Sequence, residues 1–168
     1  KRYDVRAIFF LVAREAEKHP NIVSDIVKQG HLIGNHTYSH PHGQRLNYFQ
    51  YRLEVFHAQA VLESLSGIKI KLFRPPCGEF NFVTFLSAKS LRLKVVLWSV
   101  GGGEWSFRKN QSAVEITNSL KSTIRDRQIV LLHDNNNKVP TVLNELLPFL
   151  KDQGYDLSSA VSEIKYAI

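Results

Sequence analysis

Two histidines four residues apart, His36 and His40, have the type and spacing that most directly suggest chemistry. They enclose the segment His-Thr-Tyr-Ser-His, and their imidazoles project to the same side if this segment turns helically. Imidazole suits zinc, cobalt and related ions, and two nitrogens are half of a tetrahedral site. The alternative is a pair of exposed or capping histidines without a ligand. The spacing alone leaves both interpretations open.

Other residues that could belong to a site follow later in the chain. Arg74 opens the segment Arg-Pro-Pro-Cys-Gly, whose two prolines stiffen the loop. Trp105 closes Gly-Gly-Gly-Glu-Trp, and His133 lies in Leu-Leu-His-Asp. Each also has a purely structural interpretation. Arg74 could form a surface salt bridge, Trp105 could belong to the apolar core, and His133 could simply end a strand.

The elements that must position these residues alternate between strands and helices. Strands are predicted at 6–12, 31–33, 71–73, 95–100 and 128–132, with a last short strand beginning at 154–157. Helices are predicted at 20–29, 46–65, 83–89, 114–124 and 139–151. This alternation predicts an α/β fold with a largely parallel sheet. The candidate residues each follow a predicted strand, and ligands bind at that edge in parallel α/β folds.

The composition is that of an ordinary globular protein. The chain has 168 residues, of which 43% are hydrophobic and 22% charged, and this length predicts one domain with a sizeable core. No apolar run reaches the length of a membrane span, and no signal peptide is visible. The net charge is +7, but the basic residues are scattered, so we expect no nucleic-acid partner. The single cysteine excludes an internal disulfide framework.

Taken in order, the motifs His-Thr-Tyr-Ser-His, Arg-Pro-Pro-Cys-Gly, Trp-Ser-Val-Gly-Gly-Gly-Glu-Trp and Leu-Leu-His-Asp resemble those of the polysaccharide deacetylase family. That family includes chitin, chitooligosaccharide and peptidoglycan deacetylases. The resemblance runs from Val5 to about Ile164. It implies a distorted (β/α)7-type barrel, with residues 1–168 as a single catalytic domain. The implied activity is metal-dependent hydrolysis of the linear amide C–N bond in N-acetylglucosamine-containing polysaccharide of the chitin or peptidoglycan type.

The resemblance also implies roles for individual residues. His36 and His40 would bind a divalent metal ion, zinc or a similar ion such as cobalt. His133 would be the general acid that protonates the leaving amine, because an amide nitrogen leaves poorly without a proton. Leu131 would line the pocket for the acetyl methyl group. Arg74 would orient the catalytic carboxylate.

Two further positions match residues that contact substrate in the family. Trp105 corresponds to a tryptophan of the sugar-binding groove. Cys77 stands where the family usually has tyrosine, and it keeps the main-chain N–H that helps to hold the oxyanion. Cys77 as a nucleophile is the less favoured alternative, since no paired base is evident. Gly101 stands where the family often has an aspartate that tunes the arginine, which weakens the expected network around Arg74.

The family's opening motif, Thr-Phe-Asp-Asp-Gly, is absent from this sequence. In the family its first aspartate is the general base and its second is the third metal ligand. One explanation is a fragment that lacks the first strand and helix of the barrel. Another is a catalytically inactive relative that binds carbohydrate, and acetylxylan esterase activity at the same site is a further alternative. The resemblance implies a secreted, periplasmic or cell-surface location.

Overall fold

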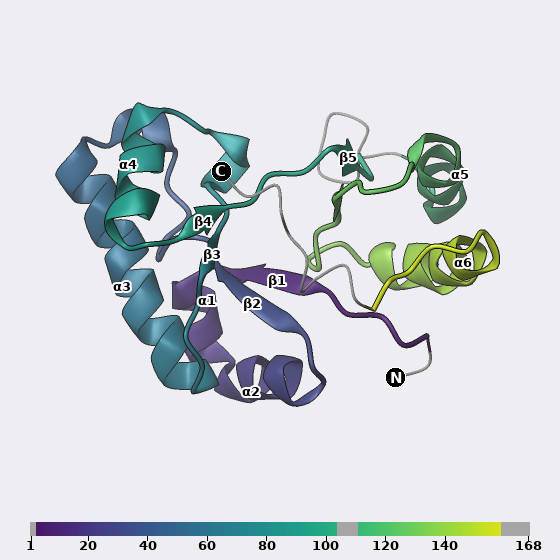
Figure 1. Cartoon of the computed structure of the whole chain (residues 1–168), viewed down its shortest axis with the longest axis horizontal. Coiled ribbons are helices and arrows are strands. Elements are labelled where there is room, and N and C mark those ends of the chain that lie inside the picture. Colours follow the sequence, from purple (N-terminus) through teal and green to yellow (C-terminus); the bar gives the residue numbers. More distant parts are fainter. Residues whose placement is uncertain (1–2, 104–110, 159–168) are drawn as a thin grey trace. The chain divides into compact units, whose positions relative to one another are not determined.

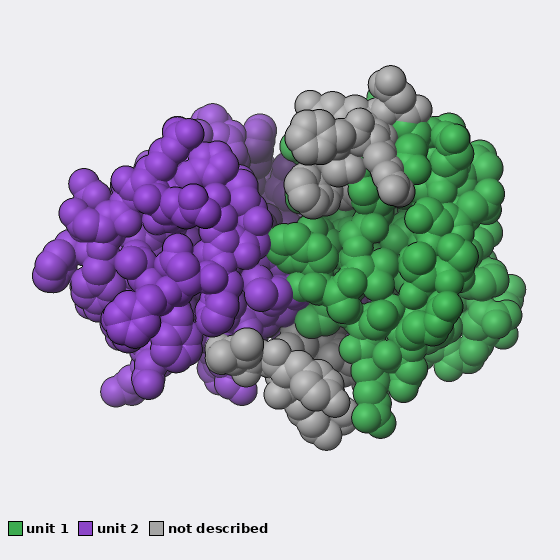
Figure 2. All heavy atoms as spheres, turned by 90° about the horizontal axis from the view of Figure 1, so that it is seen from above, with its two compact units in different colours: residues 1–5, 98–158 green, residues 6–97, 159–168 purple. Residues whose placement is uncertain are grey.

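The computed structural model describes residues 3–103 and 111–158 (Figure 1). The described residues fall into two compact units, which Figure 2 colours separately. Residues 6–97, which Figure 2 colours purple and labels unit 2, are called the first unit below. Residues 98–158 with residues 3–5, which it colours green and labels unit 1, are called the second unit. Each unit is described by itself below. A single domain over the whole chain stays a prediction.

The first unit is built on a parallel sheet of four strands in the order β1-β2-β3-β4. The strands are β1 (Ile8–Leu11), β2 (Leu32–Asn35), β3 (Leu72–Phe73) and β4 (Lys94–Val95). Their register aligns the last residues of all four strands in one row, namely Leu11, Asn35, Phe73 and Val95. The residues that follow these strands therefore emerge side by side at one edge of the sheet.

Four helices connect these strands: α1 (Ala13–Lys18), α2 (Pro20–Lys28), α3 (Tyr48–Ser66) and α4 (Phe82–Ser90). Two single 3-10 turns, η1 (Gly43–Arg45) and η2 (Pro76–Gly78), lie in the loops. The long helix α3 begins at a capping box, in which Asn47 and Gln50 each accept a backbone N–H from the other. It ends at Gly67, whose left-handed backbone (φ 70°) stops the helix.

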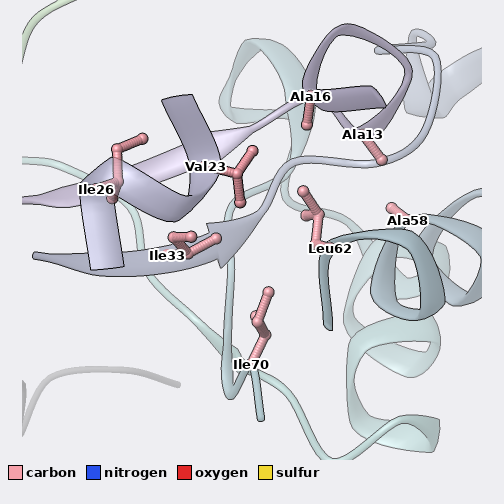
Figure 3. Close-up of a cluster of buried hydrophobic side chains, with 8 residues drawn as sticks. All are labelled: Ala13, Ala16, Val23, Ile26, Ile33, Ala58, Leu62 and Ile70. Carbon is pink, nitrogen blue, oxygen red and sulfur yellow. The ribbon is translucent and has the colours of Figure 1, made fainter. Parts of the chain in front are cut away.

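The apolar core of the first unit lies between the helices and the sheet. Figure 3 shows one cluster, to which α1, α2, β2, α3 and the segment before β3 contribute Ala13, Ala16, Val23, Ile26, Ile33, Ala58, Leu62 and Ile70. A second cluster joins α3 to α4, β3 and β4 through Tyr51, Val55, Phe73, Ala88, Leu93 and Val95. Helix α3 contributes to both clusters. Its packing therefore holds the helix in place against the strands β2, β3 and β4.

The second unit contains the parallel strands β5 (Val100–Gly101) and β6 (Val130–Leu131) and the helices α5 (Ala113–Thr123) and α6 (Val139–Asp152). The two helices share one apolar cluster, formed by Ile116, Leu120, Ile124, Val142, Leu146 and Leu150. A capping box between Ser112 and Glu115 starts α5. None of the helices in the described part of the chain combines the length and apolarity needed to cross a bilayer.

The predicted helices are confirmed with small shifts at their ends, and the structure adds α1, which the sequence analysis missed. The single strand predicted at 95–100 is wrong, because β4 ends at Val95 and β5 begins at Val100 in a different sheet. Between them, the carbonyls of Val96 and Leu97 accept hydrogen bonds from the Arg74 side chain. In a continuous strand, these carbonyls would instead accept hydrogen bonds from the backbone N–H groups of a neighbouring strand.

The short strand predicted from 154 to 157 is also wrong. Gly154 turns the chain with a φ of 81°, and the N–H of Tyr155 donates to the carbonyl of Leu150 at the end of α6. Tyr155 and Leu157 then pack against the apolar cluster of α5 and α6. Hydrophobic side chains at these positions can pack against helices as well as belong to a strand, so the sequence pattern does not distinguish the two.

Truncation of a buried side chain of α3 should destabilise the protein far more than truncation of an exposed one. Leu62 is fully buried, whereas 63% of Leu53 is exposed. Leu62→Ala should lower the free energy of unfolding by about 2–5 kcal/mol, because it removes buried contacts and leaves a cavity. Leu53→Ala, the matched control, should change it by less than about 0.5 kcal/mol. Urea denaturation measures both values, and equal losses would contradict this core.

Candidate functional site

The strand register brings two candidate residues together at one edge of the first sheet. His36 directly follows β2, and its N–H donates to the carbonyl of Leu11 at 3.1 Å. Arg74 directly follows β3, and its N–H donates to the carbonyl of Asn35 at 2.9 Å. The main chain therefore continues the ladder one residue beyond the strands. The prediction that these two candidates lie just after neighbouring strands is confirmed.

The two histidine rings lie close together, but no helix brings them there. Their centroids are 4.9 Å apart and their planes make an angle of 75°. The segment between them is an irregular loop, in which Thr37 (φ 67°) and His40 (φ 61°) adopt left-handed backbone conformations. Such conformations are uncommon for residues other than glycine, so surrounding contacts must hold them. The predicted proximity of the rings is confirmed, and the proposed helical turn is wrong.

A buried polar network holds this loop. Asn35 and Thr37 are both fully buried. The side-chain carbonyl of Asn35 accepts the N–H of Thr37 at 2.9 Å, and its amide nitrogen donates to the carbonyl of Val55 in α3, also at 2.9 Å. The Thr37 hydroxyl accepts the N–H of His40 at 3.1 Å. The network satisfies buried polar groups and sets the backbone that carries both histidines.

Helix α3 holds the loop at a second point. The carboxylate of Glu54 accepts the N–H of Ser39 at 2.8 Å and its hydroxyl at 3.0 Å. Gln59, one turn further along the helix, accepts a hydrogen bond from the Asn35 side chain at 3.2 Å. The hydroxyls of Thr37 and Ser39 therefore stabilise the loop.

The hydrogen bond from His36 defines which of its ring nitrogens can bind a metal. Its Nδ1 lies 2.6 Å from the carbonyl oxygen of Arg74. A carbonyl can only accept, so Nδ1 carries the hydrogen and the neutral ring has its lone pair on Nε2. Metal-binding histidines commonly donate their other ring nitrogen to a carbonyl in this way, which orients the ring.

The histidine pair fits the nitrogen half of a metal site. Its rings adjoin each other, and one of them is oriented as a ligand. Across residues 3–103 and 111–158, however, no aspartate, glutamate or cysteine joins His36 and His40 in a group of three potential ligands.

Arg74 is buried beside this pair, with only 7% of its surface exposed. Its Nε donates to the carbonyl of Val96 at 2.9 Å and its Nη2 to that of Leu97 at 3.1 Å. The guanidinium carbon lies 4.1 Å from the centroid of the Phe10 ring, a cation–π contact. Burial lowers the pKa of Arg74 to about 10, so the side chain stays charged at neutral pH. The alternative of a surface salt bridge is wrong.

A glycine leaves room for the aromatic ring under this guanidinium. A Cβ atom on Gly34 would lie only 2.4 Å from the Phe10 ring. The ring therefore occupies the space of a missing side chain, where it contacts the guanidinium of Arg74. No motif in the sequence pointed to this pair, because the contact depends on the register between β1 and β2.

Cys77 lies in η2 with a left-handed backbone (φ 57°). Its N–H donates no hydrogen bond to any atom of the described residues, as an oxyanion-binding group requires. Its exposed thiol lies 3.9 Å from Nδ1 of His42. Burial and the Glu79 carboxylate raise the pKa of the thiol, which disfavours a nucleophilic thiolate. The oxyanion role of the N–H stays a prediction.

Sequence reasoning missed one side-chain pair at this edge. His42 and Glu79 lie 37 residues apart, and their Nδ1 and Oε1 atoms are 2.9 Å from each other. The hydrogen bond with His42 lowers the pKa of the Glu79 carboxyl, and the backbone N–H groups of Gln44 and Gly43 lower it further. Partial burial acts in the opposite direction but is outweighed. His42 follows the histidine motif closely, which could have drawn attention to it, but nothing in the sequence indicated Glu79.

The remaining candidates belong to the second unit or lie outside the described residues. Leu131 is buried in β6, and His133 follows that strand at a half-buried position. Leu131 therefore lies in a parallel strand and His133 follows it, as predicted. Trp105 lies outside the described residues. The structure thus brings His36, His40 and Arg74 together within the first unit, and the roles of all seven candidates stay predictions.

Comparison with known proteins gives consistent results. The model of the polysaccharide deacetylase family matches residues 1–96. A peptidoglycan-N-acetylglucosamine deacetylase of Bacillus cereus is 35% identical over 158 residues, which are 92% of this chain and 56% of the relative. The chain therefore spans little more than half the length of that relative.

Two solved structures also match. PdaC of Bacillus subtilis, named a peptidoglycan-N-acetylmuramic acid deacetylase, is 28% identical with a TM-score of 0.86, over 98% of this chain and 79% of the other. A CE4 family pseudoenzyme of Bacillus anthracis is 26% identical with a TM-score of 0.86, over 92% of this chain and 54% of the other. These matches confirm the predicted α/β fold of the (β/α)7-barrel type.

Removal of the Asn35 side chain should loosen the histidine loop. Asn35→Ala leaves the buried N–H of Thr37 without its acceptor and removes the link to the Val55 carbonyl, and it should lower the free energy of unfolding by about 1–3 kcal/mol. Hydrogen exchange of the Ser39 and His40 amides should accelerate. The matched control, Asn47→Ala, removes the cap of α3 at a cost of about 1 kcal/mol and should leave these two amides unchanged. Equal exchange in both variants would show that Asn35 does not hold the loop.

Proposed function

Because this chain belongs to the polysaccharide deacetylase family, we propose that it hydrolyses N-acetyl groups of N-acetylglucosamine-containing polysaccharide of the peptidoglycan or chitin type. The observation that carries the proposal is the histidine pair at the sheet edge, with one ring oriented by the Arg74 carbonyl. The Bacillus cereus relative, whose name gives this activity on peptidoglycan, supports the choice of substrate.

His36 and His40 are the proposed protein ligands of a divalent ion, and the polysaccharide deacetylase family is generally metal-dependent. Zinc is the first choice because imidazole nitrogen suits it, and cobalt is a close alternative. When bound, such an ion polarises a carbonyl and lowers the pKa of a bound water. Within the protein, the Arg74 carbonyl keeps the His36 ring in the tautomer that presents Nε2.

His133 is the proposed general acid. It gives a proton to the amine nitrogen of the sugar as the amide C–N bond breaks, because the unprotonated amine is a poor leaving group. Its half-buried position after β6 is compatible with access to a substrate. Leu131, the buried residue of that strand, is proposed to contact the acetyl methyl group.

Three further residues are assigned to binding and positioning. The N–H of Cys77 is proposed to donate to the oxyanion, and Trp105 to stack on a sugar ring. Arg74 acts as a positioning residue, because its buried charge is fixed by two carbonyls and the Phe10 ring. Its proposed role is to orient a carboxylate next to the metal ligands.

The proposed partner is an N-acetylated polysaccharide or oligosaccharide, with no nucleic acid involved. A polymer of the cell wall places the protein outside the cytoplasm, as a secreted, periplasmic or cell-surface protein. The names of the relatives, which refer to peptidoglycan, support this location.

A catalytically inactive carbohydrate-binding protein is the second candidate. One observation favours it, namely that a CE4 family pseudoenzyme has a similar fold. Esterase activity on acetylated xylan is a variant of the first candidate, in which a better leaving group makes the general acid less important.

Acetate release with matched histidine variants tests the proposal. The zinc-loaded chain, joined to a segment that carries the family's Thr-Phe-Asp-Asp-Gly motif, should release acetate from chitin oligomers or peptidoglycan. His133→Gln should lower kcat by about 10²–10⁴-fold without loss of zinc, because only proton donation is removed. His19→Gln, a control at an exposed histidine between α1 and α2, should leave kcat unchanged.

The same assay separates the candidates. Binding of chitin oligomers without any acetate release would favour the inactive relative and overturn the enzymatic proposal. An effect of His133→Gln on amide substrates that disappears on acetylated xylan would support the general-acid role. Equal loss of activity in His133→Gln and His19→Gln would contradict that role.

A further inference from the structure

We propose that His42, Cys77 and Glu79 form a second metal site, distinct from the histidine pair, that binds a borderline or soft divalent ion such as zinc. Their potential ligand atoms, an imidazole nitrogen, a thiol sulfur and a carboxylate oxygen, all lie within 4.8 Å of one another. In the described part of the chain they form the one such group of three. The inference is independent of the proposed deacetylase activity.

Two loops bring the three side chains together. In η2 the N–H of Gly78 donates to the carbonyl of Pro75 and that of Glu79 to the carbonyl of Pro76, so the chain turns tightly around Cys77. His42 comes from the segment just before η1. The N–H of Gln44 donates to Oε2 of Glu79 at 3.3 Å, which holds the two loops together.

The separations of the ligand atoms suit a tetrahedral ion. Nδ1 of His42 lies 2.9 Å from Oε1 of Glu79 and 3.9 Å from Sγ of Cys77. Ligand atoms of a tetrahedral zinc site with usual bond lengths lie about 3.4–3.6 Å apart, between these two values. An ion therefore requires only small side-chain movements, in which it replaces the hydrogen bond between His42 and Glu79.

The donor set selects the kind of ion. Sulfur and nitrogen ligands favour zinc, cobalt or cadmium over magnesium and calcium, which prefer oxygen. A thiolate and a carboxylate together balance the charge of a divalent cation, and the thiol proton passes to solvent when the ion binds. Because His42 and Cys77 are exposed, an ion can enter from solvent and keep water as a fourth ligand.

Cobalt binding provides a direct test, because a thiolate bound to Co²⁺ gives a charge-transfer absorption in the near ultraviolet. Cys77 is the single cysteine of the chain, so such a band identifies its ligand without ambiguity. Titration of the metal-free His36→Ala/His40→Ala variant, which lacks the competing histidine pair, should give the band at one equivalent of Co²⁺, independently of protein concentration. Cys77→Ser in the same variant should abolish the band.

Variants of the other two ligands complete the test. His42→Gln and Glu79→Gln should each raise the dissociation constant for the thiolate-bound Co²⁺ at least about tenfold. Matched controls at exposed residues elsewhere, His19→Gln and Glu145→Gln, should leave it unchanged. The proposal is overturned if the folded His36→Ala/His40→Ala variant gives no band at one equivalent, or if His42→Gln and Glu79→Gln in that variant both leave the dissociation constant for Co²⁺ unchanged.

Discussion

The register of the parallel sheet is the constraint on which the candidate site depends. The four strands of the first unit end in one row, at Leu11, Asn35, Phe73 and Val95. His36 and Arg74 are the next residues of two neighbouring strands, so the ladder itself places the histidine ring within reach of the arginine carbonyl. A shift by one residue in either strand would exchange inward and outward side chains and separate this pair.

Buried polar groups then convert a sheet edge into a shaped site. Asn35 and Thr37 are fully buried, but their side chains form hydrogen bonds with the loop backbone and with α3. Their polar side chains are therefore satisfied inside the protein. The two left-handed residues of the histidine loop persist because these bonds hold them. The charge of Arg74 is accommodated similarly, by two carbonyls and an aromatic ring. These polar contacts thus fix the backbone and side-chain positions of the candidate site.

The sequence predicted those features that depend on local patterns. Helical periodicity and the stop at Gly67 located α3, and the order of motifs indicated the family and the α/β fold. The sequence could not predict features that depend on contacts between distant parts of the chain. The run at 95–100 is apolar except for Ser99, so it gives no sign that the strand ends at Val95, where the next two carbonyls bind the Arg74 side chain. The pairing of His42 with Glu79 needs two loops that meet in space, which no spacing in the sequence encodes.

The central claim is that His36 and His40 form a ready nitrogen pair for a divalent ion, with Nε2 of His36 as one ligand atom. Crystals of the zinc-loaded chain, measured on both sides of the zinc absorption edge, test it most directly. The account predicts an anomalous peak about 2.0–2.1 Å from Nε2 of His36 and in contact with the His40 ring, while Nδ1 of His36 still donates to the Arg74 carbonyl. Zinc bound through Nδ1, or no zinc at this pair while the loop keeps its conformation, would contradict it.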